Sequence, residues 1–353
     1  MSDQGALGRI RSRAETARAR ARRRLHPRRL FPLLDSFRGY GRKAFTADLV
    51  AGLTVGAVLI PQGMAYALLA GLPPQAGLYA AVLPLVAYAL LGGSRQLGVG
   101  PTAISSLLVA AGIAPLAGGD ARVYVGLAAT LAVMVGLMRM AMGLGRLGFV
   151  VNFLSRPVLS GFTSAAALII AVSQLKHLLG IPIRQSEHVH IVVADAVSHL
   201  GSARVSTLAI GTVGLVLLWL VRRWRPAWPG PLLVVMAATA VVVAFDLERR
   251  GVKVVGEIPR GLPSLDAPEA DLDHLRTLLP TAVAITMLGF IESIAIAKVF
   301  AQRHGYTIKP NRELVALGVA TVAAGVSHAY PVSGSFSRTA VNASTGARTQ
   351  LAA

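Results

Sequence analysis

Long apolar segments separated by short polar ones dominate the hydrophobic pattern of this sequence. A helix needs about 20 residues to cross the hydrocarbon layer of a bilayer. Most of the segments approach that length, whereas the third and tenth are too short, as half-helices would be. The pattern therefore predicts an all-α polytopic membrane protein. The ten segments are residues 49–70, 77–92, 102–116, 123–142, 157–175, 205–221, 230–246, 277–299, 313–327 and 334–346.

Basic residues are concentrated in alternate loops, which is the distribution that the positive-inside rule gives to cytoplasmic loops. Arg95 follows the second segment, Arg146 and Arg156 follow the fourth, and residues 222–225 (RRWR) follow the sixth. The loop after the eighth segment is also basic, while the opposite loops are neutral or mixed in sign. This alternation predicts a cytoplasmic N-terminus and an external loop at residues 246–276.

Residues 331–342 (PVSGSFSRTAVN) follow an uncharged segment and are expected to start a short helix. Their proline and glycine end the preceding helix, and the side chain of Ser333 or Ser335 is expected to cap the new one. A helix N-terminus at membrane depth presents unpaired N–H groups and the positive end of the helix dipole, so it attracts anions. Arg338 adds a full positive charge about one turn later, and an arginine inside an apolar span is a functional-site candidate.

A second stretch of the same form, residues 98–107 (GVGPTAISSL), lies in the first half of the chain. Each stretch follows an apolar helix with a polar residue in it. Gln62 lies 39 residues before Pro101, and Glu292 lies 41 residues before Ser333. Paired interrupted segments in two halves of a chain indicate a transporter binding site, and the near-equal spacing indicates an internal repeat.

Composition agrees with the membrane interpretation. Hydrophobic residues make up 54% of the 353 residues and charged residues 14%, which is too apolar for a soluble domain of this length. The net charge is +19, and residues 1–47 hold 13 Lys/Arg against three acids. We interpret these residues as a basic, lipid-touching cytoplasmic tail, because no nucleic-acid-binding module accompanies them. The absence of cysteine excludes disulfides and thiolate metal sites.

Several motifs together resemble the sulfate permease family of anion transporters. They are residues 59–67 (LIPQGMAYA), residues 71–79 (GLPPQAGLY) and the two half-helix stretches, and the resemblance runs from about Phe45 to the last residue. It implies an inverted-repeat fold of seven plus seven segments, usually followed by a STAS domain. On that basis we expect a chain truncated after its tenth segment, with the second repeat incomplete.

The resemblance also implies a division into domains. Helices one to four and eight to ten form a core, and helices five to seven belong to a gate. The expected divisions are the basic tail at 1–47, the first core part at 48–146, the first gate part at 147–250, the external loop at 251–276 and the second core part at 277–353.

The expected function is secondary active transport of a small anion held between the two half-helix N-termini. The family places a coupling ion on the helix of Glu292, and a carboxylate in a low-dielectric span can take up a proton. Proton-coupled symport is therefore expected, with sodium as the alternative. Arg338 can pair with Glu292, face the anion or extend to the cytoplasmic side. The expected substrate-binding residues are Gln62, Tyr66, Thr102, Ala103, Ser335, Phe336, Ser337 and Arg338.

Sulfate is the favoured anion, with bicarbonate and dicarboxylates as alternatives, in a multi-pass protein of the cell (inner) membrane. A homodimer is an option that the sequence leaves open; nucleic acid, metal ions and cofactors are not expected. One rival is a nucleobase–cation symporter of the same architecture, which would favour a carboxylate where this chain has Arg338. A second rival is a non-transporting membrane scaffold. An intramembrane enzyme is disfavoured because no H-E-x-x-H or G-x-S-x-G motif occurs.

The predicted topology can be tested directly, because the chain contains no cysteine. A single cysteine introduced by Ala267→Cys lies in the expected external loop and should react with a membrane-impermeant maleimide added outside the cell. Labelling of that cysteine only from the cytoplasmic side would show that the orientation is wrong.

Overall fold

A computed structural model describes the chain from residue 40 to residue 352 with internal gaps. The expected basic tail up to residue 39, most of the expected fifth segment at 157–175 and the centre of the expected external loop lie outside the described residues. The gaps are residues 154–163, 165–167, 169–170, 173–174, 176–177, 182–188, 226–227, 229, 250, 253, 255–260 and 269–270.

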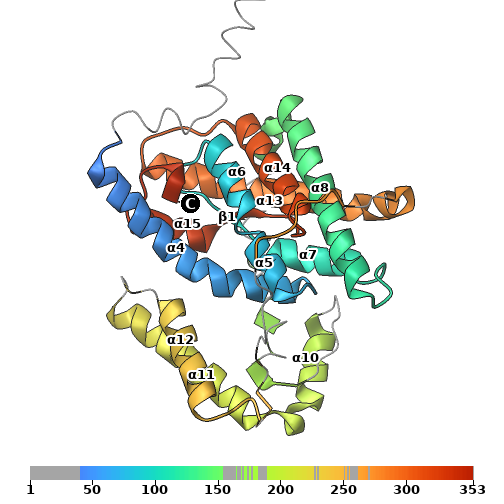
Figure 1. Ribbon diagram of the computed structural model, residues 1–353, viewed down its shortest axis with the longest axis vertical. Coiled ribbons are helices and arrows are strands. Elements are labelled where there is room, and N and C mark those ends of the chain that lie inside the picture. Colours follow the sequence, from blue (N-terminus) through green and yellow to red (C-terminus); the bar gives the residue numbers. More distant parts are fainter. Residues whose placement is uncertain are drawn as a thin grey trace, which may run out of the picture.

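Helices make up nearly all of the regular structure in the described part (Figure 1). Five helical stretches there are long and apolar enough to cross a membrane, and they coincide with the expected first, second, fourth, sixth and eighth segments. These stretches are Arg42–Leu69 (α4), Pro74–Leu91 (comprising α5, Pro74–Tyr79, and α6, Leu83–Leu91), Ala121–Leu144 (α8), Val205–Trp224 (α11) and Leu272–Arg303 (α13).

The two expected half-helices are present and short. Helix α7 (Ala103–Ile113) has 11 residues and α15 (Phe336–Ser344) has 9. Each follows a three-residue strand, β1 (Gly98–Gly100) or β2 (Ser333–Ser335). The remaining elements are α10 (Val189–Ser198), α12 (Gly230–Ala244), α14 (Pro310–Val326) and the short 3-10 helices η1 (Leu147–Phe153), η2 (Leu200–Ser202) and η3 (Gln350–Ala352).

Some boundaries differ from the expected segments, each for a local reason. The second segment is divided into α5 and α6, and each of these begins with a proline in its first turn, where proline fits without losing a hydrogen bond. Helix α13 starts at Leu272, inside the expected loop, because Asp271 caps it by accepting from the N–H of Asp273 at 3.4 Å. Helix α10 corresponds to no expected segment, since its ten residues are too few to span a membrane.

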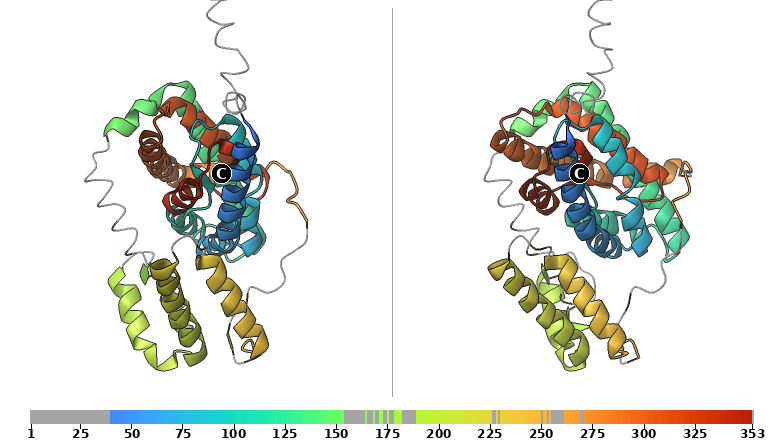
Figure 2. Two further views of the ribbon diagram at one scale, coloured as in Figure 1. Left: turned by 90° about the vertical axis from the view of Figure 1, so that its left-hand side faces the viewer. Right: turned by 60° about the vertical axis from the view of Figure 1, so that its left-hand side comes forward.

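The helices form two groups. Helices α4–α8 and α13–α15 surround the strands, while α10, α11 and α12 lie together below them (Figure 1). The same division is visible from two further directions (Figure 2). Helix α12 packs against α11 and also contacts α4. The larger group contains the elements of the expected core, and the smaller contains helices of the expected gate.

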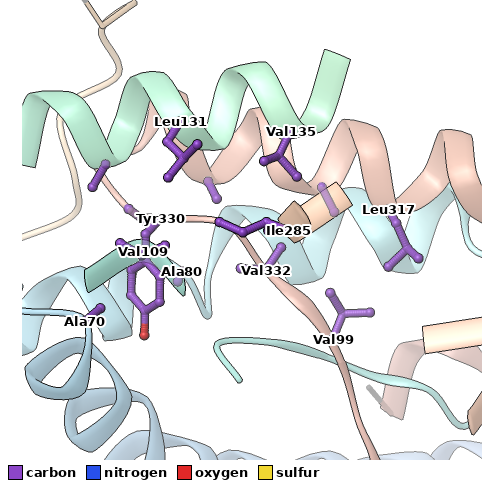
Figure 3. Packing of buried hydrophobic residues seen from close by; sticks show 14 of the residues in the cluster. Ala70, Ala80, Val99, Val109, Leu131, Val135, Ile285, Leu317, Tyr330 and Val332 are labelled. Atoms are coloured by element: carbon purple, nitrogen blue, oxygen red, sulfur yellow. The ribbon is translucent and has the colours of Figure 1, made fainter. Parts of the chain in front are cut away.

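The larger group has a continuous apolar interior. Figure 3 shows Tyr330 and Val332, which precede β2, beside Val109 of α7 and Ile285 of α13. All four side chains are fully buried. Burial of aliphatic and aromatic side chains contributes roughly 1.5–3 kcal/mol each in water, but between lipid-embedded helices close packing supplies the stabilisation instead. This interior therefore fixes the approach to β2.

A glycine seam joins α8 to α14. We use that name for Gly136 of α8 with Gly318 and Gly325 of α14. A Cβ on Gly136 would lie 2.7 Å from the carbonyl oxygen of Gly318, and one on Gly325 would lie 2.7 Å from the carbonyl oxygen of Ala129. Backbones approach this closely only where small residues face each other, so the glycines set the spacing of the two helices.

The glycine seam can be tested by adding one methyl group. Gly136→Ala should lower the free energy of unfolding by about 1–3 kcal/mol, because the new Cβ meets backbone that cannot move aside. The matched control is Gly126→Ala on the same helix, where nothing lies within 4 Å of the added Cβ; it should be neutral or stabilising by up to about 1 kcal/mol. Both values can be measured by denaturation in detergent micelles, followed by circular dichroism. Equal stability of the two variants would contradict the seam.

Candidate functional site

The two half-helices start beside each other because their strands pair. Strands β1 and β2 are antiparallel, with Gly98 opposite Ser335 and Gly100 opposite Ser333. The hydroxyl groups of Ser105 and Ser333 also lie 3.4 Å apart, which links α7 to β2. At about 3.3 Å per strand residue, the strand ends that lead into the two helices, Gly100 and Ser335, are separated by on the order of 10 Å. The expected juxtaposition of two helix N-termini is therefore present in this fold.

Arg338 lies at this junction and is fully buried. Its Nη1 donates a hydrogen bond to Oε1 of Gln62 at 3.0 Å, and Nε2 of Gln62 donates to the hydroxyl of Tyr66 at 3.2 Å. Nε and Nη2 of Arg338 have no hydrogen-bond partner among the described residues. The side chain thus joins α15 to α4, does not extend to the surface, and keeps two donor atoms unused. A buried cation without a paired anion is costly, so these donors are suited to an anionic ligand.

The cap of α15 differs from the sequence prediction. Ser335 occupies the N-cap position, but its hydroxyl lies 3.1 Å from that of Ser337 and accepts no hydrogen bond from the helix backbone. The hydroxyl of Ser333 instead contacts Ser105 and Arg139. The prediction of a side-chain cap by either serine is wrong, because both hydroxyls have other partners. The first N–H groups of α15 are left without a side-chain acceptor.

The first half-helix, by contrast, has a side-chain cap. Thr102 precedes α7 and its hydroxyl oxygen accepts from the N–H of Ser105 at 3.4 Å. Thr102 and Ala103 are both buried. At the other half-helix, Phe336 is 57% exposed and its ring lies 5.8 Å from that of Phe300 on α13. The expected site residues therefore all lie on α4 or at the starts of α7 and α15, but they differ in what they offer a ligand.

Glu292 is half-buried on α13 and forms neither a hydrogen bond nor an ion pair with a described residue. It interacts electrostatically with Arg338 and Arg139 at longer range. The adjacent Ser293 anchors β2, because its hydroxyl accepts from the N–H of Gly334 at 2.8 Å. Helix α13 therefore places a carboxylate near the junction without neutralising Arg338 by direct contact.

Arg139 of α8 is a residue that the sequence analysis missed. It is fully buried, and its Nη1 donates to the hydroxyl of Thr321 at 2.8 Å and to the carbonyl of Val332 at 2.7 Å. Its Nη2 donates to the hydroxyl of Ser333 at 3.1 Å and to the carbonyl of Ile285 at 3.3 Å. The rule that drew attention to Arg338 applies here as well, because Arg139 is the one charged residue in the fourth apolar segment.

Two further buried carboxylates accept hydrogen bonds from backbone N–H and hydroxyl groups near helix ends in the larger group of helices. Glu313 of α14 accepts from the hydroxyl of Tyr88 at 2.7 Å and from the N–H of Gly93 at 2.6 Å. Asp48 of α4 accepts from the N–H and the hydroxyl of Thr349 at 3.1 and 2.6 Å. These carboxylates take up backbone donors at chain turns, so they are structural.

The loop between α13 and α14 adds a phenol to these end contacts. Tyr306 donates to Oε1 of Gln96 at 2.6 Å and accepts from the N–H of Arg95 at 3.0 Å. Burial raises the pKa of Tyr306 above that of a free phenol, so it remains a neutral hydrogen-bond partner at physiological pH. It ties the α6–β1 connection to the following loop.

Comparison with known proteins gives the family of this chain. A profile described as the sulfate permease family matches residues 45–353. A probable sulfate transporter of Mycobacterium tuberculosis is 43% identical over 320 residues, covering 91% of this chain and 57% of the relative. The chloroplastic sulfate transporter 4.1 of Arabidopsis thaliana is 39% identical over 331 residues, covering 91% of this chain and 48% of the relative. The chain thus spans about half the length of these curated relatives.

Solved structures share the fold. The murine anion transporter Slc26a9, in an inward-facing state, superposes with a TM-score of 0.84 and 28% identity, over 92% of this chain and 57% of that one. The transmembrane domain of the cyanobacterial bicarbonate transporter BicA gives 0.78 and 27%, over 88% and 79%. The expected inverted-repeat fold is confirmed by these matches, and the relatives are transporters, not enzymes. The chain belongs to the sulfate permease family.

Proposed function

We propose that this chain carries the anion site of a secondary active transporter, with a small inorganic anion as substrate. The observation that carries the proposal is Arg338, a fully buried cation with two unused donor atoms beside the uncapped start of α15. Free N–H groups at a helix start and an unpaired guanidinium together favour a negatively charged ligand. Sulfate is the favoured substrate, since relatives from two kingdoms are named as sulfate transporters; bicarbonate, named for BicA, is the alternative.

The proposed site contains the residues expected from the sequence. Arg338 and the first N–H groups of α15 would bind the anion, and Gln62 and Tyr66 would orient the guanidinium through their hydrogen-bonded chain. Thr102 and Ala103 line the other helix start, where the threonine cap competes with an anion for the α7 N–H groups. Ser335, Phe336 and Ser337 complete the site.

The proposed transport cycle requires two groups of helices. The group containing the strands would carry the bound anion, and its movement against α10, α11 and α12 would alternate access to the two sides. In the proposed orientation the N-terminus is cytoplasmic and the protein lies in the cell membrane. The coupling ion is proposed to be a proton carried by Glu292, which has no direct partner among the described residues.

Removal of the guanidinium should weaken anion binding. We expect Arg338→Ala to raise the dissociation constant for sulfate by about 10- to 100-fold, since a charge-assisted hydrogen bond contributes roughly 1.5–3 kcal/mol. Ser335→Phe should also weaken binding, by filling the start of α15. Isothermal titration calorimetry of the full-length protein in lipid nanodiscs measures the dissociation constants of both variants.

A matched control for that experiment is Arg348→Ala, which removes the same charge from an exposed side chain ten residues further on. It should leave the sulfate affinity unchanged. Unchanged affinity in Arg338→Ala for sulfate, bicarbonate and dicarboxylates alike would refute the proposed site. Binding of uracil in place of every anion would indicate a nucleobase–cation symporter instead.

Proton coupling can be separated from anion binding at Glu292. Glu292→Gln resembles the protonated side chain but cannot release a proton, so it should bind sulfate yet fail to concentrate it above equilibrium under an inward proton gradient. Uptake into proteoliposomes is measured with a proton gradient and a sodium gradient imposed separately. Accumulation by Glu292→Gln at the wild-type level under the proton gradient would exclude Glu292 as the carrier, and uptake driven by sodium alone would exclude the proton.

A further inference from the structure

Arg139 holds the backbone that leads into the anion site. Its four hydrogen bonds connect α8 to α13, α14 and the start of β2, and two of them end on Val332 and Ser333. Ser335, where α15 begins, lies two residues further along the same strand. Guanidinium geometry suits several oxygen acceptors at once. The position of the α15 start therefore depends on this side chain, although none of its four hydrogen bonds ends on an expected anion-binding residue.

The neighbouring helix leaves space for the guanidinium. A Cβ on Gly289 of α13 would collide with Nη2 of Arg139 and with the hydroxyl of Ser333. Because Gly289 has no side chain, α13 can lie against the guanidinium, and its Ile285 carbonyl can accept one of the four bonds. The charge is thus enclosed by backbone and hydroxyl oxygens contributed by three other elements.

No carboxylate pairs with this charge among the described residues. The acid that interacts with it electrostatically is Glu292, which acts on Arg338 as well. When all three groups are ionised, the two arginines and one glutamate carry a net charge of +1, and protonation of Glu292 makes it +2. In a buried region such charges act over about 10 Å with little screening. Arg139 binds Ser333, and the distance from Ser333 to the start of α15 is of the same order.

We propose that Arg139 is a positioning residue for the anion site and that its unpaired charge makes the site prefer divalent over monovalent oxyanions. The proposal rests on the function proposed above and adds the valence of the substrate to it. The hydrogen bonds of Arg139 fix β2 and the start of α15, and the charge of Arg139 acts on the bound anion through space. The effect of the charge scales with the charge of the anion, whereas the effect of the hydrogen bonds does not.

The test compares two tetrahedral oxyanions that differ in charge, sulfate and perchlorate. Arg139→Gln should raise the dissociation constant of perchlorate about tenfold and that of sulfate about a hundredfold, because the Coulomb interaction doubles with the anion charge. Arg139→Lys keeps the charge but loses the fork of donors, so it should weaken both anions by a similar factor. Calorimetry with the whole chain in lipid nanodiscs gives both constants and hence their ratio.

Three variants separate charge from structure. Arg122→Gln removes the same charge from an exposed position on the same helix, about 26 Å away at 1.5 Å per residue, and should leave the ratio unchanged. Thr321→Val removes one acceptor of Arg139 without a change of charge and should affect both anions equally. If Arg139→Gln does not fold, the double variant Arg139→Met/Thr321→Val also removes the Thr321 hydroxyl, which would otherwise lose its donor. It should show the same change in the ratio of the two dissociation constants.

The outcomes distinguish this inference from the proposed function. If the wild-type chain binds sulfate and Arg139→Gln weakens both anions equally, the residue is structural only and the inference on valence is overturned. If the wild-type chain binds neither anion, the proposed function fails and the inference fails with it. A tenfold loss of sulfate selectivity in Arg139→Gln, with selectivity retained in Arg139→Lys, supports the inference.

Discussion

Helices that are interrupted inside an apolar protein leave backbone N–H and C=O groups without partners, and the centre of this molecule is built around that constraint. Strands β1 and β2 satisfy part of it by pairing with each other. Side chains from other helices satisfy further groups: Ser293 accepts from the Gly334 N–H, Thr339 from the Gly98 N–H, and Arg139 donates to the Val332 carbonyl. The same contacts that make the interruptions tolerable also hold the two half-helices in register.

The two halves meet this constraint in unequal ways. In the first half, the hydroxyl of Thr102 accepts from the N–H of Ser105, so the start of α7 has a side-chain cap. In the second half, the serine hydroxyls are engaged elsewhere, so α15 keeps its N–H groups open and has Arg338 one turn into the helix. The half-helix therefore occurs twice, but the uncapped helix start and the unpaired guanidinium nitrogens belong to the second copy. The pairing of strands then brings the capped helix start to the side of the uncapped one.

Sequence patterns were sufficient for the architecture because membrane helices need long apolar runs and half-helices need short ones. Five spans, both half-helices and the place of Arg338 near the start of the second one followed from length, proline and glycine placement, and intramembrane charge. The direction of the Arg338 side chain was left open by the sequence. The cap of α15 did not follow, because Ser335 has the residue type and position of a cap and only the fold shows that its hydroxyl faces Ser337. The bonds of Arg139 join residues up to 194 positions apart, a proximity that no local pattern encodes.

The glycine seam has a mechanical consequence for the charge that lies beside it. Arg139 follows Gly136 by three residues, Thr321 follows Gly318 by three, and the hydrogen bond between the two crosses the seam. At the seam, carbonyl oxygens of each helix lie directly against glycines of the other. Sliding would bring backbone into backbone, so the two helices resist it. The seam therefore holds the backbone of Arg139 in a fixed position. We expect sliding between helices only where longer side chains form the contacts.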